Sequence, residues 1–519
     1  IDDLDMMEGE SGTEGWQKSG LTVIIIGASG DLAKKKTYPS LLDLYDGDHL
    51  PVDTSIWGFA RSSLTHEDLR ARLKPYLMKT AHDEGIIDSF LERCFYHQGK
   101  SYGDVDAMKT MTSSVRRHEL QSTDHLRANR MYYFAIPPNV FAEAGIAIKQ
   151  VGMAENGWTR IVVEKPFGRD LQSYEVLSET LSKNFSEHHL YRIDHYLGKE
   201  MVQNLLIMRF SNIWFERLWN RDSVQCIIIT FKEPFGTDGR GGYFDQYGII
   251  RDILQNHLLQ VLTLLTMEPP IKVDGPEGSQ SIRDAKVQVL KSMPPITLDD
   301  CLLGQYEGYT DDETITNKDT NTPTFAAISL HINNPRWAGV PIIMKAGKSL
   351  DERKAEMRIQ FKDAPAADFL FDSKTPRNEL VIVMQPEESI YMKSNVKTPG
   401  FSAIPVQSEL DLNYDTRFFE NDEKSPAAYT RLLLDVLRGR QAAFVRDDEL
   451  RRSWEIFTPL LHQIENSNVR PVMYKQGSRG PKEADDFISE KSGYVRNENY
   501  VYKDSHKDGS VAGKKSNTT

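Results

Sequence analysis

One short stretch of the chain, residues 192–200, carries a carboxylate, an imidazole, a phenol and an ammonium group close together. It lies where a strand-like run passes into a segment with helical spacing, and the free N–H groups of a first helical turn attract anions. Because residues four apart share one helix face, His195 and Lys199 are predicted to project together. A phosphate held by His195, Tyr196 and Lys199 is one interpretation. A capped helix start, with Asp194 as the cap and solvated neighbours, is the other.

A second stretch joins a buried strand to a glycine turn. Residues 21–26 are mostly β-branched and apolar, which is typical of a strand buried on both faces of a parallel sheet. Strand, glycine turn and helix open a dinucleotide-binding fold, in which glycines let backbone N–H groups approach a pyrophosphate. The spacing is G-x-x-G rather than G-x-G-x-x-G, so an ordinary tight turn is the competing interpretation. The residues predicted to bind the coenzyme here are Gly27, Ala28, Ser29, Gly30, Asp31, Leu32 and Lys36.

The strand after this turn indicates which coenzyme is bound. Residues 55–60 read as a strand that ends in Arg61, and no acidic residue follows until Glu67. A guanidinium group there would pair with a ribose 2′-phosphate, whereas a carboxylate would repel it. NADP is therefore favoured over NAD, although a surface arginine at a strand end is the plainer alternative.

Two further strand-like runs end in residues that could face the same ligand. The first, residues 130–136, stops at Pro137, and the second, residues 159–163, leads into Lys165. Ligands of open parallel sheets bind at the carboxyl ends of the strands. Pro137 is therefore predicted to contact the coenzyme, and Lys165 could reach both nicotinamide and substrate. A solvated loop lysine is the alternative for Lys165.

The pattern of strand-like segments and of the connections between them changes after residue 200. Turn clusters rather than long helices separate most of the strand-like segments, which predicts a mainly antiparallel sheet from residues 224–232, 325–333, 341–345, 355–361 and 379–385. A long apolar helix, residues 247–267, carries His257 in its middle. Such a histidine is more often a core residue than a catalyst, but a buried imidazole requires a partner. Asp194 would be one, and the pair would suit proton abstraction near neutral pH.

Length and composition restrict the classes of function. The chain has 519 residues, too many for one ordinary domain, so two large domains are expected. A net charge of −12 argues against general binding to nucleic acid or to anionic membranes, because both need a positive field. Three cysteines in no metal-like spacing fit a reducing compartment, and no metal site is expected. Without a visible signal peptide or a transmembrane-length apolar run, the expected location is the cytosol.

Taken together, these residues resemble the glucose-6-phosphate dehydrogenase family. The resemblance extends from about Leu21 to His506 and is carried by the motifs at 27–33, 164–168, 192–200, 248–257, 346–348 and 352–354. It implies an α/β Rossmann domain that binds NADP and a larger α+β domain whose mainly antiparallel sheet forms dimers or tetramers. The corresponding boundaries are a disordered acidic N-terminus at 1–20, the Rossmann domain at 21–198, the second domain at 199–502 and a disordered tail at 503–519.

The resemblance also implies a reaction and the residues that perform it. A hydride leaves C1 of β-D-glucose 6-phosphate for NADP, His257 acts as the general base, and Asp194 orients it. Lys199 completes the expected catalytic set. The positions implied to bind substrate are Lys165, His195, Tyr196, Lys199, Glu233, Asp252, Lys348, Arg353 and Gln385. One difficulty is that Asp252 and His257 lie roughly 140° apart on an ideal α-helix of about 3.6 residues per turn.

Some members of that family carry a second, structural NADP site in the C-terminal domain. The residues that agree with it here are Lys354, Arg358, Lys393 and Arg479. Val383 replaces an arginine, Arg496 a tyrosine and Tyr502 a tryptophan. Losing an arginine removes a phosphate contact, and losing aromatic faces removes stacking for the nucleotide, so a weak or absent second site is predicted.

Two other functions compete with a dehydrogenase for this substrate. An oxidoreductase of the glucose–fructose type would act on an unphosphorylated sugar and would not need His195, Tyr196 and Lys199 together. A non-catalytic NADP-binding sensor would be expected to lose Asp194 or His257, and both are present. A P-loop kinase is excluded, because no Gly-Lys-Ser/Thr follows the glycines.

Overall fold

The computed structural model describes residues 15–80, 82–121, 128–371, 375–419, 425–467, 469–498 and 500–502. The tail at 503–519 and most of the N-terminal segment 1–20, both predicted to be disordered, lie outside these ranges. The chain divides into two compact units. The first comprises 1–198, 270–284 and 426–451, and the second comprises 199–269, 285–425 and 452–519. Two later segments, 270–284 and 426–451, therefore belong to the first unit.

The first unit is built on a sheet with the strand order β15-β6-β5-β4-β1-β2-β3. Its strands are β1 (Gly20–Ile26), β2 (Ser55–Ala60), β3 (Cys94–Gln98), β4 (Ala128–Phe134), β5 (Thr159–Val163), β6 (Leu190–Ile193) and β15 (Phe444–Val445). Neighbours pair in parallel, except that β15 pairs antiparallel with β6. The strand order reverses at β1, as in the Rossmann fold, which confirms that part of the predicted fold class.

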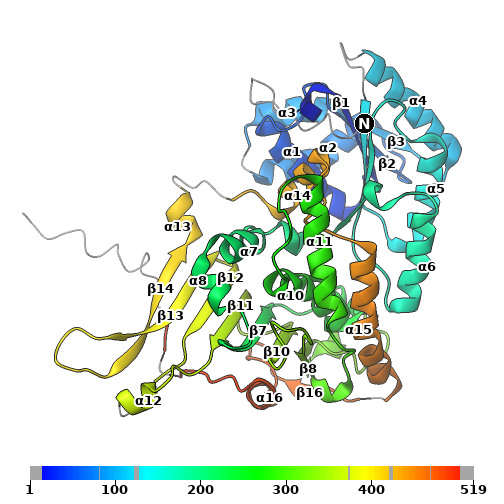
Figure 1. The fold of residues 1–519 in the computed structure, drawn as a ribbon. Helices are drawn as coiled ribbons and strands as arrows, with labels where there is room; N and C mark the ends of the chain where they lie inside the picture. The colour runs from blue at the N-terminus through cyan, green and yellow to red at the C-terminus, as the bar shows by residue number, and fades with distance from the viewer. Residues whose placement is uncertain are drawn as a thin grey trace, which may run out of the picture. The chain divides into compact units, whose positions relative to one another are not determined.

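Helices cover both faces of this sheet (Figure 1). One face carries α1 (Tyr38–Asp46), α2 (His66–Leu77), α3 (Glu84–Glu92) and α14 (Ala428–Arg438). The other carries α4 (Val105–Gln121), α5 (Phe141–Val151) and α6 (Leu171–Ser182). Because both faces are covered, every residue of β1 and β2 is buried, as their apolar runs require. Capping boxes at Thr65 and Asp170 set the starts of α2 and α6.

The second unit contains a sheet with the order β14-β13-β12-β11-β7-β10-β9-β8-β16. Its strands are β7 (Val224–Lys232), β8 (Cys301–Tyr306), β9 (Phe325–Leu330), β10 (Ile342–Gly347), β11 (Lys354–Phe361), β12 (Glu379–Gln385), β13 (Ser389–Lys397), β14 (Pro405–Asn413) and β16 (Val472–Tyr474). Most neighbours are antiparallel, as predicted, while β7–β10 and β8–β16 are parallel. The sequence did not predict β8, β13, β14 or β16. In β13 and β14 many residues are partly exposed, so no long apolar run marks these strands.

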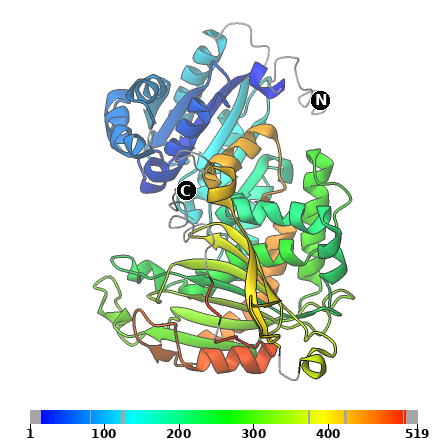
Figure 2. The ribbon, with the colours of Figure 1, turned by 90° about the vertical axis from the view of Figure 1, so that its left-hand side faces the viewer.

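The helices of the second unit include α7 (Glu200–Ser211), α8 (Ile213–Leu218), α9 (Gly241–Phe244), α10 (Leu259–Thr266), α12 (Ala367–Leu370), α13 (Tyr414–Phe418) and α16 (Glu483–Ser492). Helix α16, near the red end of the colour range, lies against the sheet (Figure 2). Its Ile488 packs against Ile228 and Ile343. The assignment to units changes within α11 (Gly275–Lys291) and α15 (Asp447–Asn466). No helix in the described ranges is long and apolar enough to span a bilayer.

The segment predicted as one long helix, 247–267, has two backbone conformations. A π-helix, η8 (Ile250–Leu258), comes first, and α10 continues from it. Gln255 and Ser453 fasten the π-helical part to α15: the amide donates to Ser453 Oγ at 2.7 Å, and that hydroxyl donates to the Gln255 carbonyl at 2.9 Å. Apolar periodicity could not distinguish a π-helix from an α-helix here, because both bury the same kind of residue.

Candidate active site

The glycine turn after β1 leaves its backbone open to a ligand. Gly27 has a φ of +88°, and a Cβ there would lie 2.4 Å from the Ala135 carbonyl oxygen. The Gly27 N–H donates to the Phe59 carbonyl at 2.7 Å, and the Gly30 N–H donates to the Gly27 carbonyl at 2.9 Å. The turn is thus held between the ends of β2 and β4, at the point where the strand order reverses. This crowding admits only glycine at Gly27, and the cradle fits a dinucleotide pyrophosphate.

The end of β2 supplies groups that suit a 2′-phosphate. The hydroxyls of Ser29 and Ser62 lie 3.0 Å apart, so the glycine turn contacts the residue that follows Arg61. The exposed Arg61 guanidinium lies 5.3 Å from the centre of the Tyr102 ring, a cation–π contact that orients it. The Tyr96 hydroxyl donates to the Ser62 carbonyl at 2.6 Å. These residues fit NADP.

The remaining residues predicted to contact the coenzyme lie around the same turn. Asp31 forms ion pairs with Lys35 at 2.9 Å and Lys34 at 3.1 Å, which lower the pKa of its carboxyl group. Lys36 is exposed on the π-helix η3 (Ala33–Thr37), and Pro137 is exposed just after β4. Ala28 is buried and Leu32 is half-buried.

The 192–200 stretch contains a break where the sequence predicted one continuous helix. Strand β6 ends at Ile193, a 3₁₀ turn η7 covers His195–Gly198, and α7 begins at Glu200 with Lys199 as its N-cap. The prediction that His195 and Lys199 share one helix face is therefore wrong. At this break the chain packs closely on α14: a Cβ at Gly198 would lie 2.5 Å from the Ala428 carbonyl oxygen, so only glycine fits there.

Asp194 does act as a cap. Its Oδ1 accepts the Tyr196 N–H at 3.0 Å, and its carbonyl accepts the Leu197 N–H at 3.0 Å. The carboxylate is buried and caps the 3₁₀ turn, whereas the interpretation made from the sequence was a capped helix start with solvated neighbours; α7 begins later, and Tyr196 and Leu197 are buried. The His195 ring lies between two tyrosines, with centroids 5.1 Å from Tyr196 and 5.9 Å from Tyr429. Nothing in the local sequence marks Tyr429, which comes from α14.

Three residues predicted to bind substrate meet in the second unit. The Lys348 Nζ lies 2.6 Å from Glu233 Oε2 and 3.4 Å from Asp252 Oδ2. Burial alone would lower the pKa of Lys348, but the carboxylates of Asp252 and Glu233 raise it overall, so the ammonium stays charged. Two carboxylates held in this way are acceptors suited to sugar hydroxyls.

The π-helix removes the geometric difficulty found in the sequence. Asp252 and His257 both lie in η8, and they are five residues apart. Because π-helical hydrogen bonds run from residue i to residue i+5, this spacing stacks the two residues on roughly one face. His257 is buried, with 1% of its surface exposed. A sugar that contacts Asp252 can therefore also meet the imidazole without lying across the helix axis.

A second group of predicted substrate residues lies beside α7. The Lys199 Nζ donates to Gln385 Oε1 at 3.1 Å, at the carboxyl end of β12. The pKa of Lys199 is lowered overall, mainly by burial. The charge of Glu388 opposes this effect, and the charge of Arg353 adds to it. Two cations close together, Lys199 half-buried and Arg353 exposed, form a site suited to a phosphate.

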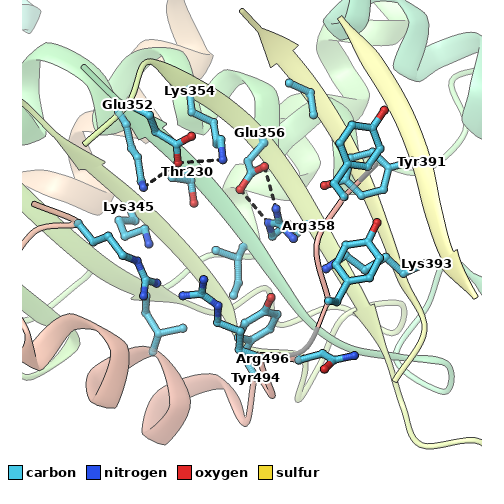
Figure 3. A pocket seen from close by; sticks show the side chains of 18 of the residues that line it. Thr230, Lys345, Glu352, Lys354, Glu356, Arg358, Tyr391, Lys393, Tyr494 and Arg496 are labelled. Atoms are coloured by element: carbon cyan, nitrogen blue, oxygen red, sulfur yellow. Dashed lines mark hydrogen bonds and ion pairs between the residues drawn. The ribbon is translucent and has the colours of Figure 1, made fainter. Parts of the chain in front are cut away.

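A separate cavity of about 680 Å³ lies on the sheet of the second unit, beside the C-terminal segment (Figure 3). Two of its cations, Arg358 and Lys393, are paired with carboxylates of the sheet. Arg358 binds Glu356 and Glu379, each at 2.7 Å, and Lys393 binds Glu379 at 2.9 Å. Burial would raise the pKa of Glu356, but Arg358 lowers it to about 2, so the pair is charged at neutral pH.

The aromatic faces of this cavity are covered as well. Tyr391 stacks on Tyr502 with ring centroids 4.4 Å apart, and the Lys393 ammonium lies 4.4 Å from the Tyr500 ring centre. A dinucleotide would have to break these ion pairs and separate the stacked rings. The residues present therefore do not fit a second NADP, in line with the substitutions at Val383, Arg496 and Tyr502.

Two family models match the chain. The model described as "Glucose-6-phosphate dehydrogenase, NAD binding domain" matches residues 24–204, and "Glucose-6-phosphate dehydrogenase, C-terminal domain" matches residues 206–498. A cytoplasmic isoform of glucose-6-phosphate 1-dehydrogenase from Solanum tuberosum is 50% identical over 487 residues, 93% of each chain. Glucose-6-phosphate 1-dehydrogenase from Dictyostelium discoideum is 50% identical over 492 residues, 93% of this chain and 96% of the relative.

Solved structures agree with these matches. A glucose-6-phosphate dehydrogenase in complex with glucose 6-phosphate superposes with a TM-score of 0.87 at 45% identity, covering 92% of this chain and 99% of the other. Glucose-6-phosphate 1-dehydrogenase from Mycobacterium avium superposes with a TM-score of 0.80 at 31% identity, covering 93% and 99%.

Replacing the guanidinium at the end of β2 tests the coenzyme assignment. Arg61→Ala is expected to weaken NADP binding about 10- to 100-fold, because a hydrogen bond to a charged group contributes about 1.5–3 kcal/mol, and to leave NAD binding unchanged. Isothermal titration with each nucleotide measures both. Arg72→Ala, an exposed arginine on α2, is the matched control. An equal loss for NAD and NADP would contradict the assignment.

The number of bound coenzymes tests the second cavity. The wild-type chain is expected to bind one NADP, measured by equilibrium dialysis, since Arg358 and Lys393 of the cavity are paired with Glu356 and Glu379. Combining Val383→Arg with Arg496→Tyr and Tyr502→Trp should create measurable binding of a second NADP. Two NADP molecules on the wild-type chain would show that the internal pairs yield to the nucleotide.

Proposed function

The chain belongs to the glucose-6-phosphate dehydrogenase family, and we propose that it oxidises D-glucose 6-phosphate at C1 to 6-phospho-D-glucono-1,5-lactone with hydride transfer to NADP. This is the first oxidative step of the pentose phosphate pathway. One observation carries the assignment: the two domain models of this family match residues 24–204 and 206–498, nearly the whole chain. The turn at Gly27 and the cluster at Lys348 support it.

The proton is removed by His257. Its imidazole takes the proton of the C1 hydroxyl while the hydride leaves C1, so the C–O bond becomes a lactone carbonyl. Bound NADP supplies the hydride acceptor. Asp194 stabilises the imidazolium form of His257 and selects its tautomer, as a buried carboxylate does beside a catalytic histidine. Lys165 lies in the loop after β5 and positions the sugar against the coenzyme.

The substrate is held at its two ends. Lys199, Arg353 and Gln385 bind the phosphate from the second unit, and His195 and Tyr196 contribute from the loop after β6. Glu233 and Asp252 accept hydrogen bonds from sugar hydroxyls, and Lys348 keeps these two carboxylates paired in the absence of sugar. The nearby cations around Lys199 favour a phosphorylated sugar over the free sugar that a glucose–fructose-type oxidoreductase would use.

The assembly and the location of the protein are also proposals. We propose a homodimer or homotetramer formed through the sheet of the second unit. The edge strand β14 supports this, because Leu410 is 69% exposed and Val406 is 37% exposed. We also propose that the protein works in the cytoplasm, since the Solanum tuberosum relative is named a cytoplasmic isoform.

Removing the base tests the mechanism. His257→Asn is expected to lower kcat for glucose 6-phosphate about 10²- to 10⁴-fold with a nearly unchanged Kd, because general-base catalysis contributes on that scale. The increase in reduced-nicotinamide absorbance gives the rate, and titration of the variant gives substrate binding. His331→Asn, an exposed histidine of the second unit, should retain full activity. A variant with wild-type kcat would remove His257 from this role.

A comparison of two substrates tests the phosphate site. Lys199→Met is expected to raise KM for glucose 6-phosphate about 10- to 100-fold, because a charged hydrogen bond to phosphate is lost. With free glucose as the substrate, its KM should remain close to that of the wild type. Lys362→Met, an exposed lysine, is the control. If both substrates lose affinity equally, Lys199 does not recognise the phosphate.

A further inference from the structure

A buried carboxylate stands directly beside Lys165 in the first unit. Glu164 follows the last residue of β5, and 6% of its surface is exposed. The Tyr133 hydroxyl of β4 donates a hydrogen bond to Glu164 Oε1. The Tyr429 hydroxyl of α14 also acts on this carboxylate and lowers its pKa. Two separate elements therefore converge on the residue that precedes Lys165.

Tyr429 also connects this carboxylate to the next loop. Its ring is nearly parallel to that of His195, at an interplanar angle of 10° and a centroid distance of 5.9 Å. A rigid ring cannot move toward or away from Glu164 without changing its contact with His195. The loops after β5 and β6 are thus joined by one side chain from α14.

We propose that Tyr133 and Tyr429 are positioning residues, which hold the Glu164 carboxylate in one orientation and thereby fix Lys165 and His195 for the reaction. This inference rests on the proposed function. Neither tyrosine touches the reacting atoms in this scheme. Their effect passes through Glu164 to Lys165 and through the Tyr429 ring to His195.

The protonation of Glu164 can be followed through the pH dependence of the reaction. Burial has the largest effect on the Glu164 carboxyl group and raises its pKa to about 7. The hydroxyls of Tyr133 and Tyr429 and the charge of Lys165 act in the opposite direction, and the charge of Asp194 adds to the increase. These groups come from β4, α14, the Glu164 loop itself and the end of β6. Below pH 7 the carboxyl group is therefore neutral and no longer attracts Lys165. Removing a hydrogen bond to the charged form raises the pKa further, so the carboxylate is lost at a higher pH.

The chain offers a matched pair of tyrosines for the test. Tyr132 and Tyr133 are adjacent on β4 and both are buried, but the Tyr132 hydroxyl donates to the Gly152 carbonyl at 2.6 Å instead of to Glu164. Tyr133→Phe is expected to lower kcat/KM for glucose 6-phosphate about tenfold. It should also move the acid limb of the pH profile upward by roughly one unit. Tyr132→Phe should leave that limb in place.

Further variants keep the outcome decisive. Glu164→Gln should abolish the ionisation that Tyr133→Phe displaces. If Tyr133→Phe does not fold, Tyr429→Phe takes its place, with Thr430→Val as its control, because the neighbouring Thr430 hydroxyl binds Asp43 at 2.7 Å instead of Glu164. An acid limb that is the same in wild type, Tyr133→Phe and Glu164→Gln would overturn the positioning role. A wild-type protein inactive on glucose 6-phosphate would instead overturn the proposed function.

Discussion

A charge buried at the end of an apolar strand must be paired, and this requirement shapes the candidate site in both units. Removing an unpaired ion from water costs several kcal/mol even after the protein relaxes. Lys348 meets the requirement with Glu233 at 2.6 Å and with Asp252. Glu164 accepts a hydrogen bond from the Tyr133 hydroxyl, and because burial still raises its pKa to about 7, it also avoids an unpaired charge by taking up a proton. In each case the partner comes from a different strand or helix, so the functional charges can be buried only when the whole unit has folded.

The topology determines which residues can become partners. In the first unit, parallel strands bring the turn at Gly27, the Lys165 loop and the Asp194 turn to the carboxyl edge of one sheet. The segment 426–451 then returns to this unit late in the sequence. It supplies α14, whose Ala428 carbonyl forces a glycine at Gly198, and whose Tyr429 reaches His195. A helix far away in the sequence thereby shapes the motif that is richest in functional groups.

The second unit contains two groups of cations with different surroundings. Around Lys199, the positive charge of Arg353 and the carboxylate of Glu388 both act on the ammonium group, and the two cations suit a phosphate. In the cavity beside the C-terminal segment, Arg358 and Lys393 are neutralised by Glu356 and Glu379. Ion pairs and stacked tyrosines there occupy the groups that a nucleotide would need. The sheet is consequently stabilised at this point by the protein's own side chains.

The sequence by itself determined the features that depend on local patterns. The apolar run of residues 55–60 predicted β2 with its correct ends, since both faces of that strand are buried. The glycine turn at Gly27, the charged groups of 192–200 and the family resemblance followed from residue types and spacing. Strand β13 and the edge strand β14 were not predicted, because strands with many partly exposed residues lack a continuous apolar run. Only the tertiary structure decided that residues 250–258 form a π-helix, that a 3₁₀ turn packed on α14 interrupts the predicted helix, and that Tyr133 and Tyr429 both act on Glu164. The reason is physical: each of these features depends on contacts between residues far apart in the chain, and local periodicity carries no record of such contacts.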